Sequence, residues 1–137
     1  MATIKQAKIK NTRELAEANK GSAVVLAKGE ALMLTAGLAV PATSATVRAT
    51  LLGVCNQNIT AAEALTRVSY IVPSDEDTFI FSTTNNSNPT HNGQAMVLSN
   101  STNVNNTGTT SATGIVVQVE PFGVAADRLI IGKFVTI

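Results

Sequence analysis

The sequence predicts an all-β protein, a small β-barrel, β-tulip-like or sandwich domain with an extended N-terminal arm. Short apolar runs rich in Val, Ile and Thr are separated by turn-forming residues at intervals of about ten positions, a spacing typical of sandwiches and small barrels. Charged residues make up only 14% of the chain, against about a quarter in most globular proteins. With 137 residues, the chain is long enough to form one domain with its own hydrophobic core.

The N-terminal segment, residues 1–20, is expected to form the arm, and residues 21–137 are expected to form the β domain. The arm begins with Lys5, Lys8 and Lys10 and has no acidic residue before position 14. Such a segment suits contact with an acidic neighbouring protein, on which it would become ordered. A frayed terminus without a function is the alternative reading.

A short helix over residues 12–19 is compatible with the pattern of the arm. Asn11 and Glu14 match a helix capping box, and Gly21 is a suitable stop. A helix of about two turns is stable only when it packs against another element.

The β domain begins with two apolar runs around a Lys-Gly-Glu turn, which predict a hairpin or strand pair over residues 23–34. An apolar run over residues 49–55 predicts a buried strand. The next segment gives two signals, because Thr60 and Glu63 match a capping box whereas residues 65–72 alternate. We take the alternation as the stronger signal and expect a strand.

Four further strands are predicted in the second half of the chain, each bounded by turn-forming residues. The segment before them, rich in Pro, Ser and acidic residues, predicts a turn. The four strands are expected over residues 78–83, 93–99, 115–122 and 129–137.

An uncharged run extends from Phe79 to Val119 and contains two polar loops, residues 83–92 and 100–113. Both loops consist mostly of Asn, Ser, Thr and Gly, whose side chains or backbone freedom satisfy tight turns locally. The composition fits either ordered loop tips or disordered segments. Uncharged tips that form hydrogen bonds suit a partner of either sign.

The sequence predicts neither an enzyme nor a bound cofactor or metal. His91 and Cys55 are the single residues of their types, and together they cannot complete a four-ligand zinc site. Cys55 lies in an apolar run, where burial disfavours the reactive thiolate. The acidic residues 75–77 are more typical of a solvated turn than of a calcium loop, because the ligand spacing of an EF-hand is missing.

Charge and hydropathy exclude two classes of partner. The formal net charge is +1, far from the cationic excess of a nucleic-acid-binding protein. Charged residues and glycines interrupt the apolar stretch of residues 23–40, so it is not expected to cross a membrane.

The order of segments resembles that of capsid decoration (cement, or head-stabilising) proteins of tailed bacteriophages. The similar features are a Lys-Gly-rich start, a strand, a Thr/Ala/Val-rich linker, Leu-Gly-Val followed by an Ile-Thr-Ala loop, a strand ending in Pro-Ser-Asp, and a Phe-rich strand. They are carried by the stretch GEALMLTAGLAVPATSATVRATLLGVCNQNITAAEALTRVSYIVPSDEDTFIF. The resemblance covers about residues 21–137. It consists of the residue composition of the segments and their order along the chain, without an invariant motif.

This resemblance implies a small β-barrel or β-tulip domain without enzymatic activity, often trimeric, on the outside of an icosahedral capsid. It implies synthesis in the host cytoplasm and a position in the virion, where an arm lies across subunits of the major capsid protein. On this hypothesis the capsid-binding residues of the arm are Ile4, Lys5, Lys8, Lys10 and Arg13.

A second hypothesis is another virion or adhesion module, such as a tail or receptor- or glycan-binding β domain, which the polar loops favour. The low aromatic content of 4%, with no Trp, is unfavourable for it, because sugar sites commonly stack on aromatic rings.

Overall fold

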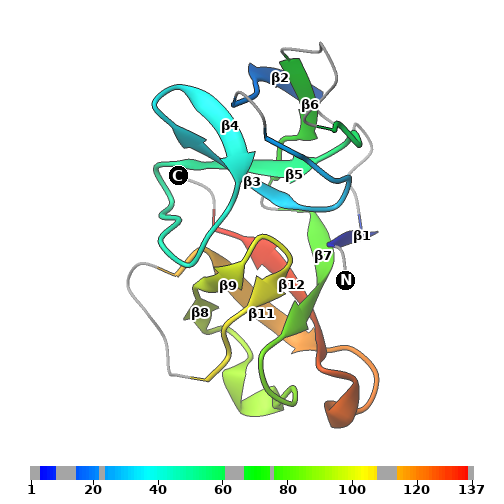
Figure 1. Cartoon of the computed structure of the whole chain (residues 1–137). Coiled ribbons are helices and arrows are strands. Elements are labelled where there is room, and N and C mark those ends of the chain that lie inside the picture. The colour runs from blue at the N-terminus through cyan, green and yellow to red at the C-terminus, as the bar shows by residue number, and fades with distance from the viewer. Residues whose placement is uncertain are drawn as a thin grey trace.

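A computed structural model describes residues 4–8, 15–21, 24–60, 67–74, 76–107 and 114–135. The prediction of an all-β fold is confirmed, because the described residues form strands and only two short 3-10 helices (Figure 1). The elements are β1 (Lys5–Lys8), β2 (Leu15–Asn19), β3 (Ala31–Thr35), β4 (Leu38–Pro41), β5 (Leu51–Cys55), β6 (Arg67–Ile71), β7 (Thr78–Thr83), η1 (Pro89–His91), β8 (Ala95–Met96), β9 (Leu98–Asn100), β10 (Asn103–Val104), β11 (Val116–Pro121), η2 (Ala125–Asp127) and β12 (Leu129–Phe134).

One sheet, which we call the barrel sheet, has the order β8-β11-β12-β7-β10-β9 and is nearly closed. Its two end strands, β8 and β9, follow each other in the chain and are separated only by Val97. The carbonyl of Met96 accepts the N–H of Ile115, and the carbonyl of Val97 accepts the N–H of Asn105, both at 2.9 Å. The segment from β8 to β9 therefore pairs with both ends of the sheet and leaves little of its edge unpaired.

The N-terminal strand β1 joins the barrel sheet along β7. It pairs with the first half of β7, where Lys5 lies opposite Ile80, and β10 pairs with the last two residues of the same edge. The described start of the arm is thus built into the sheet, beside the strand on which the barrel core is centred.

The second sheet is antiparallel, with the order β2-β6-β5-β3-β4, and lies above the barrel sheet in Figure 1. It also curls back toward itself, because Lys20 forms a bridge with Ala39 and the N–H of Gly21 donates to the Ala39 carbonyl at 3.0 Å. Leu26 forms a further bridge with Ile59, and both side chains pack in the core of this sheet.

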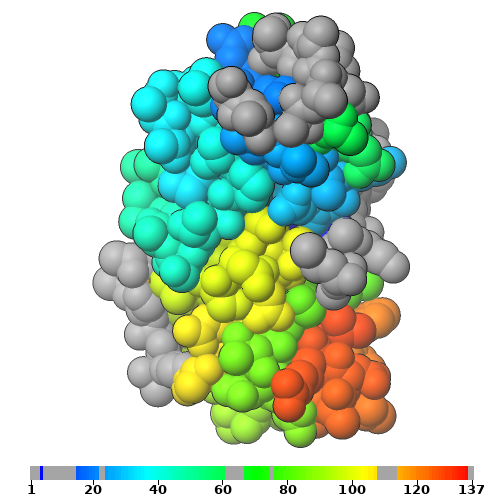
Figure 2. Space-filling view, viewed as in Figure 1, coloured from blue at the N-terminus to red at the C-terminus, as the bar shows by residue number. Residues whose placement is uncertain are grey.

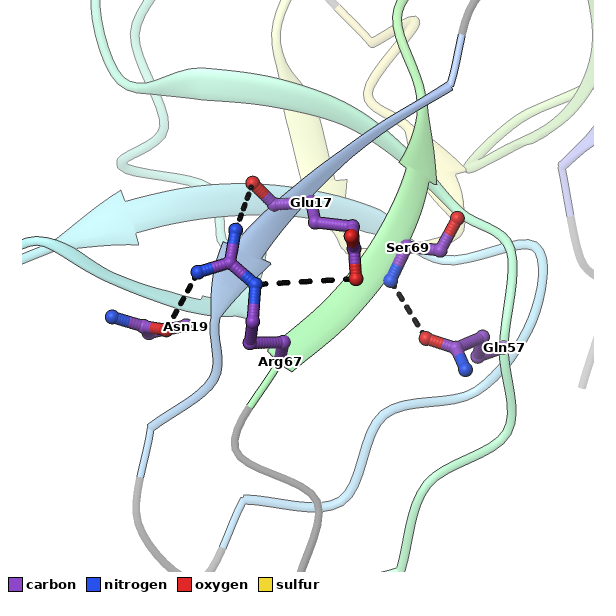
Figure 3. A network of polar contacts seen from close by, with 5 residues as sticks. All are labelled: Glu17, Asn19, Gln57, Arg67 and Ser69. Atoms are coloured by element: carbon purple, nitrogen blue, oxygen red, sulfur yellow. Dashed lines mark hydrogen bonds and ion pairs between the residues drawn. The ribbon is translucent and has the colours of Figure 1, made fainter.

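Strand β2 is also tied to β6 by polar side chains at the surface (Figure 3). Arg67 Nη1 donates to Asn19 Oδ1 at 3.4 Å, and Arg67 Nε lies 3.9 Å from Glu17 Oε2. Nearby, Gln57 Oε1 accepts the N–H of Ser69 at 2.7 Å. An ion pair this exposed contributes little to stability, so the backbone ladder between β2 and β6 is what holds β2 in the sheet.

Two hydrophobic cores meet at the strand pair β3 and β5. On β3, Ala31 and Met33 face the barrel core, whereas Leu32 faces the core of the second sheet. On β5, Leu51 and Val54 face the barrel core. This strand pair is therefore a shared wall, and it closes the upper end of the barrel.

A β-bulge makes the shared wall possible. The pairing of β3 with β5 slips by one residue, since Leu32 lies opposite Gly53 and Met33 lies opposite Leu51. The extra residue, Leu52, points into the second core. An inserted residue changes which face the following side chains take, so Leu51 and Val54 reach the same core although they are three positions apart.

Three phenylalanines occupy the centre of the barrel core. Phe79 and Phe81 alternate inward on β7, and Phe134 reaches them from β12. Phe134 makes edge-on contacts with both other rings, each at a centroid distance of 5.3 Å, an arrangement that aromatic pairs favour.

The structure corrects two predictions for the first half of the chain. The described part of the expected helix at residues 12–19 is strand β2, because pairing with β6 satisfies its backbone in place of a marginal helix. The hairpin expected around the Lys-Gly-Glu turn lies later, between β3 and β4 at Ala36 and Gly37. Residues at the expected first strand bridge to Ile59 instead.

Gly53→Ala is expected to destabilise the protein by about 3 kcal/mol or more. An added Cβ would collide with the carbonyl oxygen of Ile71, which is backbone and cannot move alone, and would lie 3.2 Å from Pro73 Cδ. Urea unfolding measures the change in the free energy of unfolding. Gly37→Ala is the matched control, because φ is +79° there but no atom lies within 4 Å, so only backbone strain of about 1–2 kcal/mol is expected. Equal losses in the two variants would contradict a crowded shared wall.

Candidate functional site

The residues predicted for the arm fall into three groups. Ile4 is only 4% exposed and packs in the barrel core, and its N–H donates to the Gly29 carbonyl at 2.8 Å. Lys5 and Lys8 lie in β1, opposite Ile80 and Thr78. Lys10 and Arg13, the remaining two, lie outside the described residues. Ile4 therefore anchors the start of the chain to the fold and does not itself form a surface contact.

The two reactive residue types are not brought together. Cys55 is buried in the core of the second sheet, whereas His91 belongs to η1 at the far end of the barrel sheet. Asp77 is buried as well, and its Oδ2 accepts from both the N–H and the hydroxyl of Ser74 at 3.1 Å. This carboxylate closes a turn, and the described residues contain no group of three His, Cys, Asp or Glu side chains that could hold a metal ion.

The most distinctive surface lies at the lower end of the barrel sheet in Figures 1 and 2. It consists of residues 84–94, 105–107 and 122–128, which we call the loop surface. The three segments are joined by hydrogen bonds: the N–H of Ser87 donates to the Ala125 carbonyl at 3.2 Å, and the N–H of Asn85 donates to Asn106 Oδ1 at 2.8 Å. Figure 2 shows the green and orange segments side by side there.

Asparagine side chains order this surface. Six asparagines lie on it, and each makes a side-chain hydrogen bond: Asn85, Asn86, Asn88, Asn92, Asn105 and Asn106. Asn100 and Asn103, in strands β9 and β10, make side-chain hydrogen bonds as well. Most of these bonds reach backbone groups or neighbouring loops. Of the two readings that the sequence allows, the described parts of the polar loops therefore match ordered tips.

Asn106 makes the most connections between loops. It is buried, and its Oδ1 accepts from the N–H of Asn85 while its Nδ2 donates to the carbonyls of Asn85 and Asn86 at 3.1 and 3.2 Å. One amide thus satisfies three backbone groups of another loop, which would otherwise lose hydrogen bonds.

The charges on the loop surface are engaged within it. Asp127 Oδ2 accepts the N–H of Val124 at 3.1 Å. Arg128 donates from Nε to Asn86 Oδ1 at 3.3 Å and from Nη1 to the Thr84 carbonyl at 3.1 Å. The two formal charges are adjacent and opposite, so the surface has no net field that would select a partner by charge.

An apolar group lies on and beside the same surface. Phe122 is 41% exposed and Val124 is 66% exposed, and exposed Val119 precedes them on β11. Ala125 and Ala126 are exposed next to them. Exposed apolar clusters mark protein interfaces, whose buried cores are more apolar than the rest of the surface.

Sequence reasoning missed the apolar group because residues 123–128 were expected to be an ordinary loop. The available signal was the placement of Phe122 and Val124 on either side of Gly123, where a turn would normally carry polar residues. The role of Arg128 had no local signal, since its partners lie more than 40 positions earlier in the chain.

Two further properties of the described residues concern the acidity of Cys55 and the length of the helices. Burial raises the pKa of the Cys55 thiol, as the sequence predicts, and the Glu30 carboxylate acts in the same direction. No helix in this part of the chain is long and apolar enough to cross a membrane.

Asn106→Ala is expected to lower the free energy of unfolding by about 1–3 kcal/mol, because the N–H of Asn85 and the carbonyls of Asn85 and Asn86 lose the hydrogen bonds that Asn106 supplies. Hydrogen exchange of the amides at residues 84–88 is expected to accelerate. Asn105→Ala is the matched control, since its Oδ1 accepts only a local bond from the N–H of Thr107. Unchanged exchange at residues 84–88 in Asn106→Ala would show that the loops are ordered by other contacts.

Cys55 gives the protein a defined pH dependence. Its pKa is raised in the folded state, so the folded chain keeps the thiol proton where the unfolded chain loses it. The resulting stabilisation is complete below the ordinary value of 9.0 and is lost as the pH rises through the folded-state pKa. We expect Cys55→Ala to be less stable at neutral pH but to show a flatter decline of stability above pH 9.0, measured by urea unfolding. Identical slopes in the two proteins would contradict this.

No family model matches the chain, and no curated protein is significantly similar to it.

Proposed function

We propose that the protein is a viral structural protein that binds the outer surface of an icosahedral phage capsid and bridges subunits of the major capsid protein. In this role it acts without catalysis, as a homo-oligomer and most simply as a trimer. It is made in the host cytoplasm and resides on the virion exterior. The segment order of the sequence supports this proposal through its resemblance to decoration proteins.

The observation that carries the proposal is the loop surface, which is ordered, balanced in charge and flanked by the exposed apolar side chains of Phe122 and Val124. Because Asn106 and the other asparagines already fix its loops, binding through it orders few additional groups and so loses less conformational entropy. A rigid surface of this kind is suited to a fixed assembly, in which the partner presents the same face at many equivalent positions.

Two simultaneous contacts with the capsid explain how a protein could stabilise the capsid shell although each contact alone has a modest affinity. The loop surface forms one contact in the proposal, and the basic residues of the arm, Lys5, Lys8, Lys10 and Arg13, form the other. The second contact becomes intramolecular once the first has formed and gains from effective concentration. Any free energy of binding to the intact shell is added to the stability of that shell.

The sharpest test is co-sedimentation with empty, expanded capsids of the phage that encodes the chain. Phe122→Ser combined with Val124→Ser is expected to weaken binding at least about tenfold, since each buried apolar side chain contributes about 1.5–3 kcal/mol. Val25→Ser is the matched control, because Val25 is 58% exposed and lies outside the loop surface. Circular dichroism checks that both variants fold.

Ionic strength separates the two contacts. Binding by the basic arm should weaken with salt, whereas binding by the charge-balanced loop surface should change little. Equal binding of the double variant and the control would remove the loop surface from the mechanism. Failure of the unmodified protein to bind capsids, together with binding on a glycan array, would favour the receptor- or glycan-binding alternative that the polar loops suggest.

A further inference from the structure

The loop surface contains the one Asn-Gly pair of the sequence, Asn92–Gly93, directly after η1. Both residues are exposed. In such a pair the backbone nitrogen of glycine can attack the asparagine side chain, because glycine has no side chain to hinder the approach. A bond forms between the glycine nitrogen and the asparagine Cγ, and the side-chain amide leaves as ammonia. Water then opens the resulting succinimide to aspartate or isoaspartate, so the net reaction consumes one water and releases one ammonia.

The folded structure holds both reacting groups away from this reaction. The N–H of Gly93 donates to the backbone carbonyl of Gln118 at 2.8 Å, which keeps the nucleophilic nitrogen protonated and directed outward from Asn92. Asn92 Oδ1 accepts from Gln118 Nε2 at 2.9 Å, which fixes the electrophilic amide. One residue, Gln118, therefore restrains both partners.

The backbone angle of Asn92 is a third restraint. Ring closure requires the Gly93 nitrogen to eclipse the Asn92 Cβ about the Cα–C bond. Asn92 has φ −57° and ψ 131°, an extended conformation that turns the nitrogen away from the side chain. The hydrogen bond between Gly93 and Gln118 maintains this angle, so the reaction needs the loop to open first.

Gln118 is well placed to act as such a restraint because it cannot easily move. It is fully buried on β11, and its Nε2 also donates to the Asn88 carbonyl at 2.9 Å, on the other side of η1. The loop from Asn88 to Asn92 is thereby fastened around a side chain that belongs to the barrel. Opening of the loop requires loss of several hydrogen bonds at once.

We propose that Asn92–Gly93 is a latent deamidation site, and that Gln118 is the positioning residue that keeps it closed while the barrel is folded. The site reacts in the fraction of molecules whose loop is locally open, so its rate measures that opening. Reaction would place a new carboxylate on the loop surface, where the described formal charges are the adjacent Asp127 and Arg128. The isoaspartate product would also lengthen the backbone beside η1. The proposal does not depend on the proposed function.

The test uses the full chain and peptide mapping by mass spectrometry, which detects the gain of about one mass unit and separates isoaspartate. Native protein and protein unfolded in urea are incubated at the same mildly alkaline pH. We expect Asn92 to react at least about tenfold more slowly in the native protein, since ordinary hydrogen bonds must break first. The Asn100–Ser101 pair in the same digest serves as an internal reference.

Gln118→Met tests the positioning residue, because Met has a similar volume but cannot donate to Asn92 or Asn88. We expect it to accelerate reaction at Asn92 by about fivefold to tenfold while Asn100 reacts at the rate of the unmodified protein. Circular dichroism and hydrogen exchange show whether this variant keeps the barrel. If it unfolds, sub-denaturing urea on the unmodified protein replaces it, and reaction at Asn92 is then expected to rise before global unfolding begins. Equal rates in the native and unfolded chains, or a folded Gln118→Met protein with an unchanged rate, would overturn the proposal.

Discussion

The structure depends on one constraint, that a single strand pair must face two hydrophobic cores. Strands β3 and β5 separate the barrel core from the core of the second sheet, and both faces are apolar. The bulge at Leu52 and Gly53 adjusts the alternation so that each core receives side chains that fill it. This wall closes one end of the barrel. The barrel core extends from the wall to the three phenylalanines. The opposite end is then free to carry loops.

Those loops are polar, yet they are ordered, and the reason is the choice of side chain. Asparagine offers both a donor and an acceptor at short reach, so one residue such as Asn106 can complete several backbone bonds without introducing a charge. Charged residues could order loops as well, but they would give the surface a field. The combination of order, balanced charge and exposed apolar side chains is what makes the loop surface the best candidate for contact with a partner.

The sequence predicts those strands whose own pattern is strong. Apolar alternation or buried runs mark β5, β6, β7, β11 and β12, and all five are found within about three residues of the expected bounds. By contrast, β2 has only a weak alternation over Leu15–Asn19, and its state is decided by pairing with β6 far along the chain. Ile4 resembled an arm residue because nothing nearby shows that the loop at Gly29 will receive its N–H. That the polar loops are ordered could not be predicted for the same reason. Asn106 donates to carbonyls about 20 positions earlier in the chain, which no local pattern reveals.

The position of β1 has a consequence for how the molecule is made. Its partner on the chain, the first half of β7, is synthesised long after it, because Lys5 pairs with Ile80. During translation β1 must remain unpaired until β7, about 75 positions later in the chain, has emerged. Until it docks, part of the β7 edge lies open next to β10, and open strand edges promote pairing between nascent chains. Insertion of β1 therefore cannot precede the synthesis of β7, and it removes a site at which neighbouring molecules could associate wrongly.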